Sequence, residues 1–190
     1  MPYCSSILYC DTPVTFNPYR GGCVHGCLYC SELQHGRYNP REYESWKGLE
    51  EWIKGKRNWA TRWVDSDWHI PIHIGTLSDP FPISDMQSRR MYRCLITLAE
   101  YNYPAIITTK STLAINDEYL SIIKQSNIVL QVSMVSKPFS LIYEPNAPSF
   151  RDRFAMLYSL SHNVKRLIVR CQPFIVSELD NVLGMIRVYA

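Results

Sequence analysis

Three cysteines lie close together in the stretch Asn17-Pro18-Tyr19-Arg20-Gly21-Gly22-Cys23-Val24-His25-Gly26-Cys27-Leu28-Tyr29-Cys30, at C-x3-C-x2-C spacing. Glycines stand before and between them, and glycine adopts the positive-φ turns that a tight loop requires. One short loop therefore presents three thiols to one small object. A closed structural zinc site or a closed iron–sulfur cubane takes four protein ligands, so three thiols leave one metal position open for chemistry.

The composition is that of a folded chain with a core of its own. At 190 residues one domain is expected, and 46% hydrophobic and 13% aromatic residues indicate a globular protein rather than a disordered one. The net charge of +3 is only mildly basic. It is compatible with an anionic substrate but does not by itself indicate a nucleic-acid-binding protein.

The seven cysteines are Cys4, Cys10, Cys23, Cys27, Cys30, Cys94 and Cys171. Their number is odd, their spacing is clustered, and the N-terminus shows no apolar signal region, so we expect a reducing, cytoplasmic location with cysteines as ligands rather than disulfides. No apolar run approaches the ~18 residues that a membrane-spanning helix needs. On spacing alone, a zinc site with His25, Cys4 or Cys10 as fourth ligand remains an alternative.

Hydrophobic periodicity predicts strands that alternate with helices from about residue 70 onward. We expect strands near 15–16 and over 68–75, 105–109, 128–135 and 166–171. Helices are expected over 42–63, 84–101, 116–124, 151–160 and 178–187, with irregular chain over 31–40, 75–82 and 144–150. This order predicts an α/β fold with a parallel sheet, either doubly wound or a (β/α) barrel. In both, ligand groups follow the carboxyl ends of the strands.

Five blocks of the chain, in order, resemble the radical S-adenosylmethionine (radical SAM) enzymes, in the branch related to spore photoproduct lyase. The blocks are Asn17 to Cys30, Gly75-Thr76-Leu77-Ser78-Asp79-Pro80-Phe81, Thr109-Lys110-Ser111, Glu144 to Pro148 with Arg151 to Phe154, and Arg170-Cys171-Gln172-Pro173-Phe174-Ile175. The departures are an extra glycine before Cys23, Ser31 in place of a second tyrosine, and Val176-Ser177-Glu178-Leu179-Asp180 in place of a Pro-Gly-Leu-Asn-Asp type of stretch.

The resemblance implies a partial (β/α)6 radical SAM-type barrel of parallel strands that lacks or truncates its last strand. We expect one core domain over 1–190, with a lead-in over 1–22 and a cluster loop over 23–30. It implies a [4Fe–4S] cluster on Cys23, Cys27 and Cys30, with S-adenosylmethionine (SAM) on the open iron. The implied reaction is reductive cleavage of SAM to a 5′-deoxyadenosyl radical that abstracts hydrogen from a substrate, as in a lyase. The alternative is a non-catalytic zinc or iron–sulfur binding module.

The resemblance and the residue chemistry together name a set of SAM contacts. These are Tyr29 near the adenine, Thr76, Ser78 and Asp79 after the second strand, Lys110, Ser133 and Arg153. Asp79 suits the SAM ammonium group, whereas Lys110 ends an apolar strand, where a buried ammonium needs an anion such as the SAM carboxylate. Arg153 either pairs with Glu144, contacts SAM, or lies on a solvated helix face. Cys171 is the candidate catalytic residue, as a thiol that quenches a substrate radical.

The sequence also suggests partners. The implied chemistry needs an electron donor such as flavodoxin or ferredoxin, and we expect a monomer without membrane attachment. Basic residues mixed with tryptophans over 37–63 suit either a nucleic-acid contact or an amphipathic helix packed by its tryptophans. The sequence leaves the substrate unassigned, with a nucleic-acid lesion or a nucleotide as a possibility.

Overall fold

The fold is seen in a computed structural model that describes residues 2–4, 14–19, 22–34, 46–59, 61–65 and 70–189. Its strands form one six-stranded sheet in chain order. They are β1 Tyr3–Cys4, β2 Val14–Phe16, β3 Ile72–Ile74, β4 Ala105–Thr109, β5 Ile128–Met134 and β6 Leu167–Cys171. The pairing of β1 with β2 is antiparallel, and every later neighbour is parallel.

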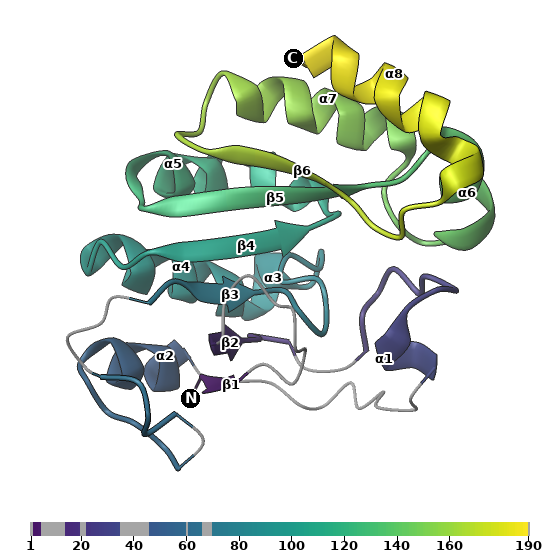
Figure 1. Ribbon diagram of the computed structural model, residues 1–190. Helices are drawn as coiled ribbons and strands as arrows, with labels where there is room; N and C mark the ends of the chain where they lie inside the picture. Colours follow the sequence, from purple (N-terminus) through teal and green to yellow (C-terminus); the bar gives the residue numbers. More distant parts are fainter. Residues whose placement is uncertain are drawn as a thin grey trace.

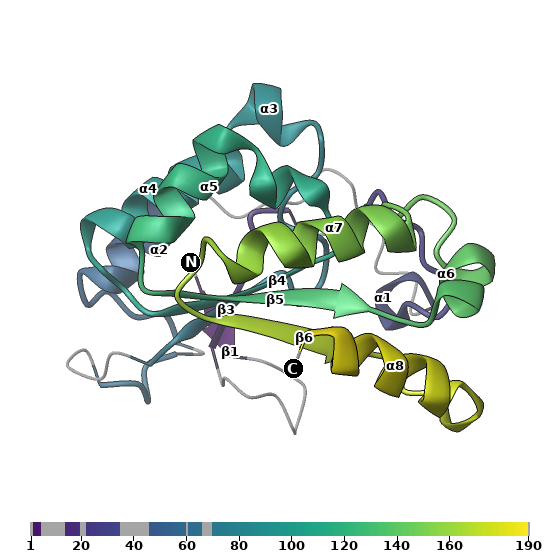
Figure 2. The same ribbon diagram turned by 90° about the horizontal axis from the view of Figure 1, so that it is seen from above.

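The helices that connect the parallel strands lie on one face of this sheet. Figure 2 shows α4, α5 and α7 together on one side of β3, β4 and β5. The helices are α1 Ser31–Gln34, α2 Trp46–Ile53, α3 Asp85–Ser88, α4 Arg90–Glu100, α5 Asp117–Gln125, α6 Lys137–Tyr143, α7 Phe150–Ser161 and α8 Leu179–Tyr189, with 3-10 turns η1 Thr112–Ile115 and η2 Val176–Glu178. A doubly wound sheet reverses its strand order, and these strands do not. The prediction of a partial barrel of parallel strands is confirmed.

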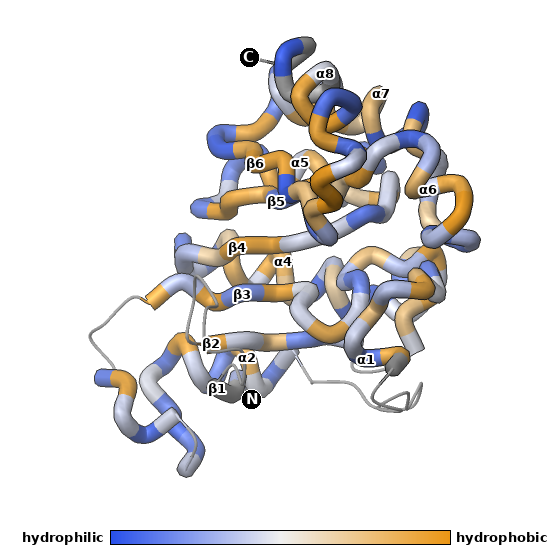
Figure 3. Tube along the Cα trace, turned by 45° about the vertical axis from the view of Figure 1, so that its right-hand side comes forward, coloured by the Kyte–Doolittle hydropathy of each residue, from blue (hydrophilic) through white to orange (hydrophobic). Residues whose placement is uncertain are grey.

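The core lies between the sheet and these helices. Alternate residues of β4 are buried, and Ala105 and Ile107 face the helices. Helix α4 contributes Leu95 and Leu98, both at 0% exposure, and α7 contributes Leu157. In Figure 3 the strand β4 is coloured as apolar through the middle of the molecule. This packing fixes the direction of each strand and therefore brings the carboxyl ends of β2 to β6 to one edge of the sheet.

The helix expected over 84–101 is in fact two helices. Arg89 has φ 56 and ψ 25, in the left-handed region, and its N–H bonds to the carbonyl oxygen of Asp85, which ends α3. The Asp85 carboxylate then accepts the N–H groups of Met91 at 2.8 Å and Tyr92 at 3.1 Å, so it caps the start of α4. The single-helix prediction was wrong because the periodic apolar face does not reveal this break.

Short elements account for other differences. The sequence prediction missed α6, although Ser136 accepts the N–H of Phe139 at 3.4 Å and Pro138 stands in its first turn. It also missed η1 and η2, and it treated the four residues of α1 as irregular. Elements this short carry too few apolar repeats for a periodicity signal.

The helix expected over 42–63 is shorter than predicted. Helix α2 ends at Ile53, and Gly55 follows with φ 94. Trp52 is fully buried, whereas Trp59 is 82% exposed, so the tryptophans do not form one packed face. Residues 42–45, 60 and 68–69 of the expected elements lie outside the described residues.

The basic residues near α2 have partners within the protein. Lys54 pairs with Glu50 at 2.7 Å, and Arg57 lies 3.8 Å from the centre of the Trp52 ring while it donates to the carbonyl oxygens of Trp52 and Val64. Arg37 and Arg41 lie outside the described residues, so a nucleic-acid contact of this region stays a prediction. Among the helices of the described residues, none has the length and apolar character to cross a membrane.

Candidate cluster and cofactor site

The residues predicted for the site follow the carboxyl ends of successive strands. The cysteine loop follows β2, Thr76, Ser78 and Asp79 follow β3, and Lys110 follows β4. Ser133 lies one residue before the end of β5, and Cys171 is the last residue of β6. Figure 1 shows these ends at the same side of the sheet, near α1 and α6. The parallel topology therefore brings together residues that are far apart in sequence.

Asp79 is the most densely hydrogen-bonded side chain of this edge. Its carboxylate accepts the hydroxyl of Thr109 at 2.8 and 3.0 Å and the N–H groups of Lys110 at 2.6 Å and Phe81 at 3.0 Å. It also lies 2.9 Å from Nε2 of His25, in the cysteine loop. Burial opposes ionisation of Asp79, yet the contact with His25 and the two N–H donors outweigh it and lower the pKa of the carboxyl group.

The Asn-Pro-Tyr segment before the cysteines is tied to the loop after β3. Asn17 donates to Thr76 Oγ1 at 3.0 Å and accepts the N–H of Leu77 at 3.1 Å. The hydroxyl of Ser78 donates to the carbonyl oxygen of Tyr19. Thr76 and Ser78 therefore hold the lead-in to the cysteine loop, and their predicted contacts with SAM stay predictions. This role of Asn17 was not predicted, because no local feature of the sequence indicates a contact between residues that are 59 positions apart.

A buried ion pair lies behind the loop. Arg153, at 0% exposure, donates to Glu144, to Ser140 Oγ at 2.8 Å and to the carbonyl oxygen of Ser133 at 3.0 Å. Burial opposes ionisation of Glu144, but the charge of Arg153 and the hydrogen bonds to it lower the pKa of that carboxyl group. Of the alternatives for Arg153, the ion pair is confirmed and the solvated helix face was wrong. Contact of Arg153 with SAM stays a prediction.

Glu144 also gathers two predicted cofactor residues. Tyr29 donates its hydroxyl to Glu144, and Lys110 Nζ lies 3.8 Å from the same carboxylate oxygen. The ammonium of Lys110 is 5.7 Å from the centre of the Tyr29 ring, and Phe139 packs against that ring at 5.7 Å. Lys110 is thus mostly buried, as expected, and Glu144 supplies an anion beside it. Burial, followed by the hydrogen bond to Glu144, raises the pKa of Tyr29.

The cysteine loop is bonded to the start of the segment after α6. Leu28 N–H donates to the carbonyl oxygen of Tyr143 at 2.9 Å, and Asn146 N–H donates to that of His25 at 3.3 Å. Gly26 has φ 55, and a Cβ there would lie 3.2 Å from the side-chain amide nitrogen of Asn146. The positive φ of this turn is what favours glycine at this position of the motif.

The three cysteines have the chemistry that an iron–sulfur cluster needs. All three are free thiols, and Cys27 is buried while Cys23 and Cys30 are half-buried. Burial, and then the charge of Asp79, raises the pKa of Cys23 to about 11, and burial also raises the pKa of Cys27. Thiols in such surroundings are deprotonated by a bound metal. Thiolates select zinc, copper(I) or iron–sulfur clusters among the common metals, so the donor set fits a cluster.

The zinc alternative fits less well. In the described part of the chain, no three His, Cys, Asp or Glu side chains are grouped as ligands for one metal ion, and this holds for Cys23, Cys27 and Cys30 as well, so the finding does not separate zinc from a cluster. Both ring nitrogens of His25 already have partners, Asp79 at 2.9 Å and the carbonyl oxygen of Asn146 at 3.4 Å. Cys10, another proposed fourth ligand, lies outside the described residues, and so does the side chain of Cys4.

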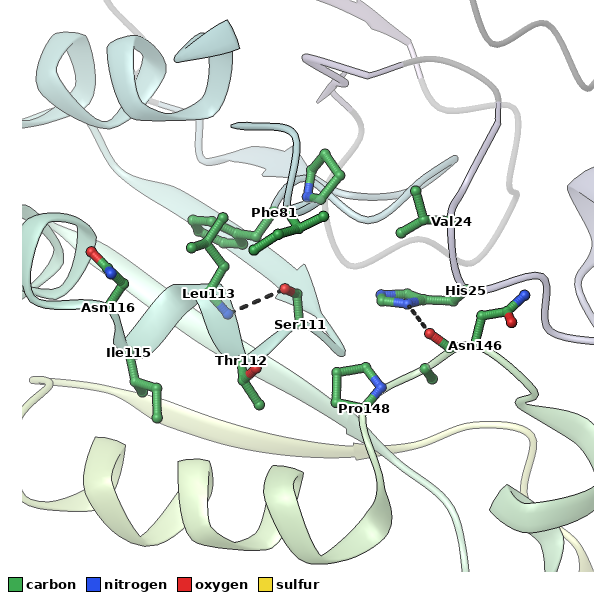
Figure 4. Close-up of a pocket in the computed structure, with 13 residues that line it drawn as sticks. Val24, His25, Phe81, Ser111, Thr112, Leu113, Ile115, Asn116, Asn146 and Pro148 are labelled. Carbon is green, nitrogen blue, oxygen red and sulfur yellow. Dashed lines mark hydrogen bonds between the residues drawn. The ribbon is translucent and has the colours of Figure 1, made fainter. Parts of the chain in front are cut away.

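A hollow of about 710 Å³ adjoins the outer side of the cysteine loop. Figure 4 shows Val24 and His25 on one side of it, Phe81 and Leu113 on another, and Pro148 near its base. Ser111, Asn116 and Asn146 add polar groups to a mostly apolar lining. None of the predicted SAM contacts lines this hollow.

A row of polar side chains crosses the sheet on the face opposite the helices. His73 Nε2 lies 2.8 Å from the Thr108 hydroxyl, which donates to Gln131 at 2.9 Å, and Arg170 donates to the same Gln131 oxygen at 3.3 Å. The strand register puts all four on one face, since His73 pairs with Ile106 and Thr108 with Gln131. No role was predicted for these four residues, because their alignment depends on the register of the strands.

Cys171, the candidate catalytic residue, ends β6 opposite Met134. It is a free, half-buried thiol whose pKa is raised by burial. Its part in catalysis and the contact of Ser133 with SAM stay predictions.

Parallel strands in chain order, helices on one face and a three-cysteine loop at the carboxyl ends define a partial radical SAM-type barrel. Solved structures with this fold include a spore photoproduct lyase complexed with dinucleoside spore photoproduct, with a TM-score of 0.74 at 16% identity over 98% of this chain and 53% of that chain. A spore photoproduct lyase double mutant with bound AdoMet and dinucleoside spore photoproduct also has a TM-score of 0.74, at 16% identity over 97% of this chain and 53% of that chain.

Another structure with this fold is that of SuiB from Streptococcus suis bound to S-adenosylmethionine. It has a TM-score of 0.65 at 13% identity, covering 91% of this chain and 36% of that chain. No protein-family model and no curated protein matches the chain. At these identities the likeness establishes the fold. The chain spans about half the length of the spore photoproduct lyase structures that it matches.

Proposed function

We propose that this chain is the core domain of a radical SAM enzyme that carries a [4Fe–4S] cluster on Cys23, Cys27 and Cys30. The observation that carries the proposal is the position of a three-thiol loop at the carboxyl ends of five parallel strands, with Asp79, Lys110 and Glu144 beside it. Two of the structures with the same fold contain AdoMet. When bound, the cluster and SAM supply reductive cleavage of SAM to methionine and a 5′-deoxyadenosyl radical.

The residues of the chain have separate tasks in this proposal. Lys110 offers a cation for the SAM carboxylate, and Glu144 fixes its position from 3.8 Å. Tyr29 lies beside Lys110, and its ring would contact the adenine of SAM. Ser78 supplies a hydroxyl group after β3, and Ser133 supplies one near the end of β5. Burial of this edge strengthens each of these contacts, because the local dielectric is low.

The substrate is proposed only at the level of a molecule with an abstractable hydrogen. The solved structures include one complexed with a dinucleoside lesion and one, SuiB, bound to a precursor peptide. The same core therefore occurs with chemically different substrates, and the reaction proposed for this chain is not limited to a lyase acting on DNA. A flavodoxin or ferredoxin as electron donor and a monomeric state remain part of the proposal.

Anaerobic reconstitution with iron and sulfide tests the proposal. We expect a brown protein that absorbs visible light and that forms 5′-deoxyadenosine when SAM and dithionite are added. Cys27→Ala removes one thiolate and should abolish both properties, whereas Cys94→Ala, at a buried cysteine of α4, should retain them. Formation of 5′-deoxyadenosine by the Cys27→Ala variant would contradict the assignment of the loop. A colourless protein that binds zinc would support the non-catalytic module.

A further inference from the structure

We infer that Asp79 is a positioning residue, which holds the cysteine loop against the ends of β3 and β4 through His25 and does not itself contact SAM. This inference rests on the proposed function, because it concerns the loop that would carry the cluster. It replaces the expectation that the Asp79 carboxylate binds the SAM ammonium group. Three observations support it.

The first observation is that both oxygens of the carboxylate are already occupied. Oδ1 accepts the Phe81 N–H at 3.0 Å and the Thr109 hydroxyl at 2.8 Å. Oδ2 accepts the Lys110 N–H at 2.6 Å and lies 2.9 Å from His25 Nε2. A carboxylate offers about four lone-pair sites, and these four contacts use them. An ammonium ligand would have to displace one of these donors.

The second observation is where these donors come from. Phe81 belongs to the turn after β3, Thr109 ends β4 and Lys110 follows it, so Asp79 is fixed to two strand ends of the sheet. The side chain is 2% exposed. Its remaining contact is the one that crosses 54 residues to the cysteine loop. The carboxylate therefore joins a rigid part of the sheet to the loop.

The third observation concerns the other end of this connection. His25 stands between Cys23 and Cys27, and the residue is 4% exposed. Its second ring nitrogen lies 3.4 Å from the carbonyl oxygen of Asn146, and its own carbonyl oxygen accepts the Asn146 N–H at 3.3 Å. Figure 4 shows the imidazole directed to this carbonyl group between the loop and the chain after α6. A histidine held in this way fixes the loop between the two flanking cysteines.

The consequence is that the loop should be ordered before any cluster binds. Hydrogen bonds to charged groups change an equilibrium by roughly tenfold to a hundredfold. Without the Asp79–His25 contact, we expect the loop to open that much more often, and Cys27, which is 7% exposed, should become reactive.

The test uses the apo chain and measures alkylation of each cysteine by iodoacetamide under native conditions, with peptide mass spectrometry. We expect Asp79→Asn and His25→Ala each to accelerate alkylation of Cys27 by about tenfold or more. The double variant should react no faster than the single variants, because both remove the same contact. Cys94, at 0% exposure in α4, reports global unfolding within the same molecule, and Glu118→Gln at an exposed ion pair controls for the loss of a carboxylate.

Each outcome decides the inference. It is overturned if Asp79→Asn leaves Cys27 alkylation within about twofold of the wild-type rate, the size expected of an ordinary surface substitution. It is also overturned if His25→Ala leaves the rate of Cys27 alkylation within about twofold of the wild-type rate. If Asp79→Asn unfolds the chain and exposes Cys94, the rate in His25→Ala alone tests the inference. Because the assay needs neither cluster nor SAM, its result is independent of the proposed activity. Equilibrium dialysis with SAM after reconstitution adds a second readout: a SAM-binding Asp79 would lose SAM in Asp79→Asn but not in His25→Ala.

Discussion

The buried pair of Arg153 and Glu144 offers a quantitative test of how this site is held together. Arg153→Met replaces a fully buried guanidinium side chain by a shorter, uncharged and apolar one. It removes hydrogen bonds to Ser133 and Ser140 and leaves the Glu144 carboxylate, whose side chain is 0% exposed, with Tyr29 and Lys110 at its other oxygen. Removing one partner of a buried ion pair costs about 3–5 kcal/mol.

This cost is large for a chain of this size, because folded domains are stable by only about 5–15 kcal/mol. With a urea dependence of roughly 2 kcal/mol/M, the unfolding midpoint should fall by about 2 M. The assay is urea unfolding of the apo chain, followed by far-UV circular dichroism. Arg151→Met, two residues earlier on the exposed side of α7, is the matched control and should change stability by less than about 0.5 kcal/mol.

The pH dependence of the Arg153→Met variant gives a further check. Without the cation, burial dominates and should raise the pKa of Glu144 above its unfolded value. A group with a raised pKa contributes its stability below the unfolded pKa and loses it as the pH rises, so the deficit of the variant should be smaller at pH 5 than at pH 8. The reasoning fails if Arg153→Met costs less than about 1 kcal/mol at pH 8, or if Glu144→Gln in the same chain does not recover part of the loss.

Substitutions at Gly75, Gly184 and Tyr119 give further predictions about the free energy of unfolding. Gly75 has φ 90, and a Cβ there would lie 2.3 Å from the Thr108 carbonyl oxygen, so Gly75→Ala should lower the free energy of unfolding by about 1–3 kcal/mol. Gly184→Ala in α8, where nothing lies within 4 Å of a new Cβ, should raise the free energy of unfolding by about 0.5–1 kcal/mol. Changes of the same sign and size for the two variants in urea unfolding would contradict both predictions. Burial, and then the hydrogen bond to Asp85, raises the pKa of Tyr119 above its ordinary value of 10.0. The stabilisation by Tyr119 is therefore complete below pH ~10, and above it the free energy of unfolding falls by up to about 1.4 kcal/mol per pH unit. In urea unfolding at pH 10–12, Tyr119→Phe should reduce this dependence on pH. The same dependence in the variant as in the wild type would contradict the role of Tyr119.

The order of strands and helices was largely predictable from the sequence. The strand predicted over 105–109 matches β4 in full, and the helix predicted over 116–124 matches α5, which Asn116 caps by accepting the Glu118 N–H at 3.1 Å. These signals are local: a strand of β-branched residues or a side chain that bonds two residues ahead leaves its mark within a few positions. Helix α6 and the break at Arg89 were not predicted, because a short amphipathic turn and a single left-handed residue leave almost no local signal in the sequence.

The identity of the candidate ligands was also a property of the sequence. The spacing of Cys23, Cys27 and Cys30 requires only that one loop carry them, and the glycines between them indicate such a loop. That Lys110 needs an anion followed from its place at the end of an apolar strand. Which anion lies beside it did not follow, because Glu144 comes 34 residues later, beyond β5 and α6.

Only the tertiary structure decided how these residues act on one another. Asp79 reads in the sequence as a turn residue or a ligand, whereas in the fold it lies among Thr109, Lys110 and His25. Arg153 is equally ambiguous until α7 packs on β5 and encloses it with Glu144. The physical reason is that hydrogen bonds and ion pairs depend on distance and burial, and the parallel sheet alone brings these distant segments to one edge. The sequence by itself therefore determined which chemical groups this edge holds, and the packing of the sheet determined which of them are partners.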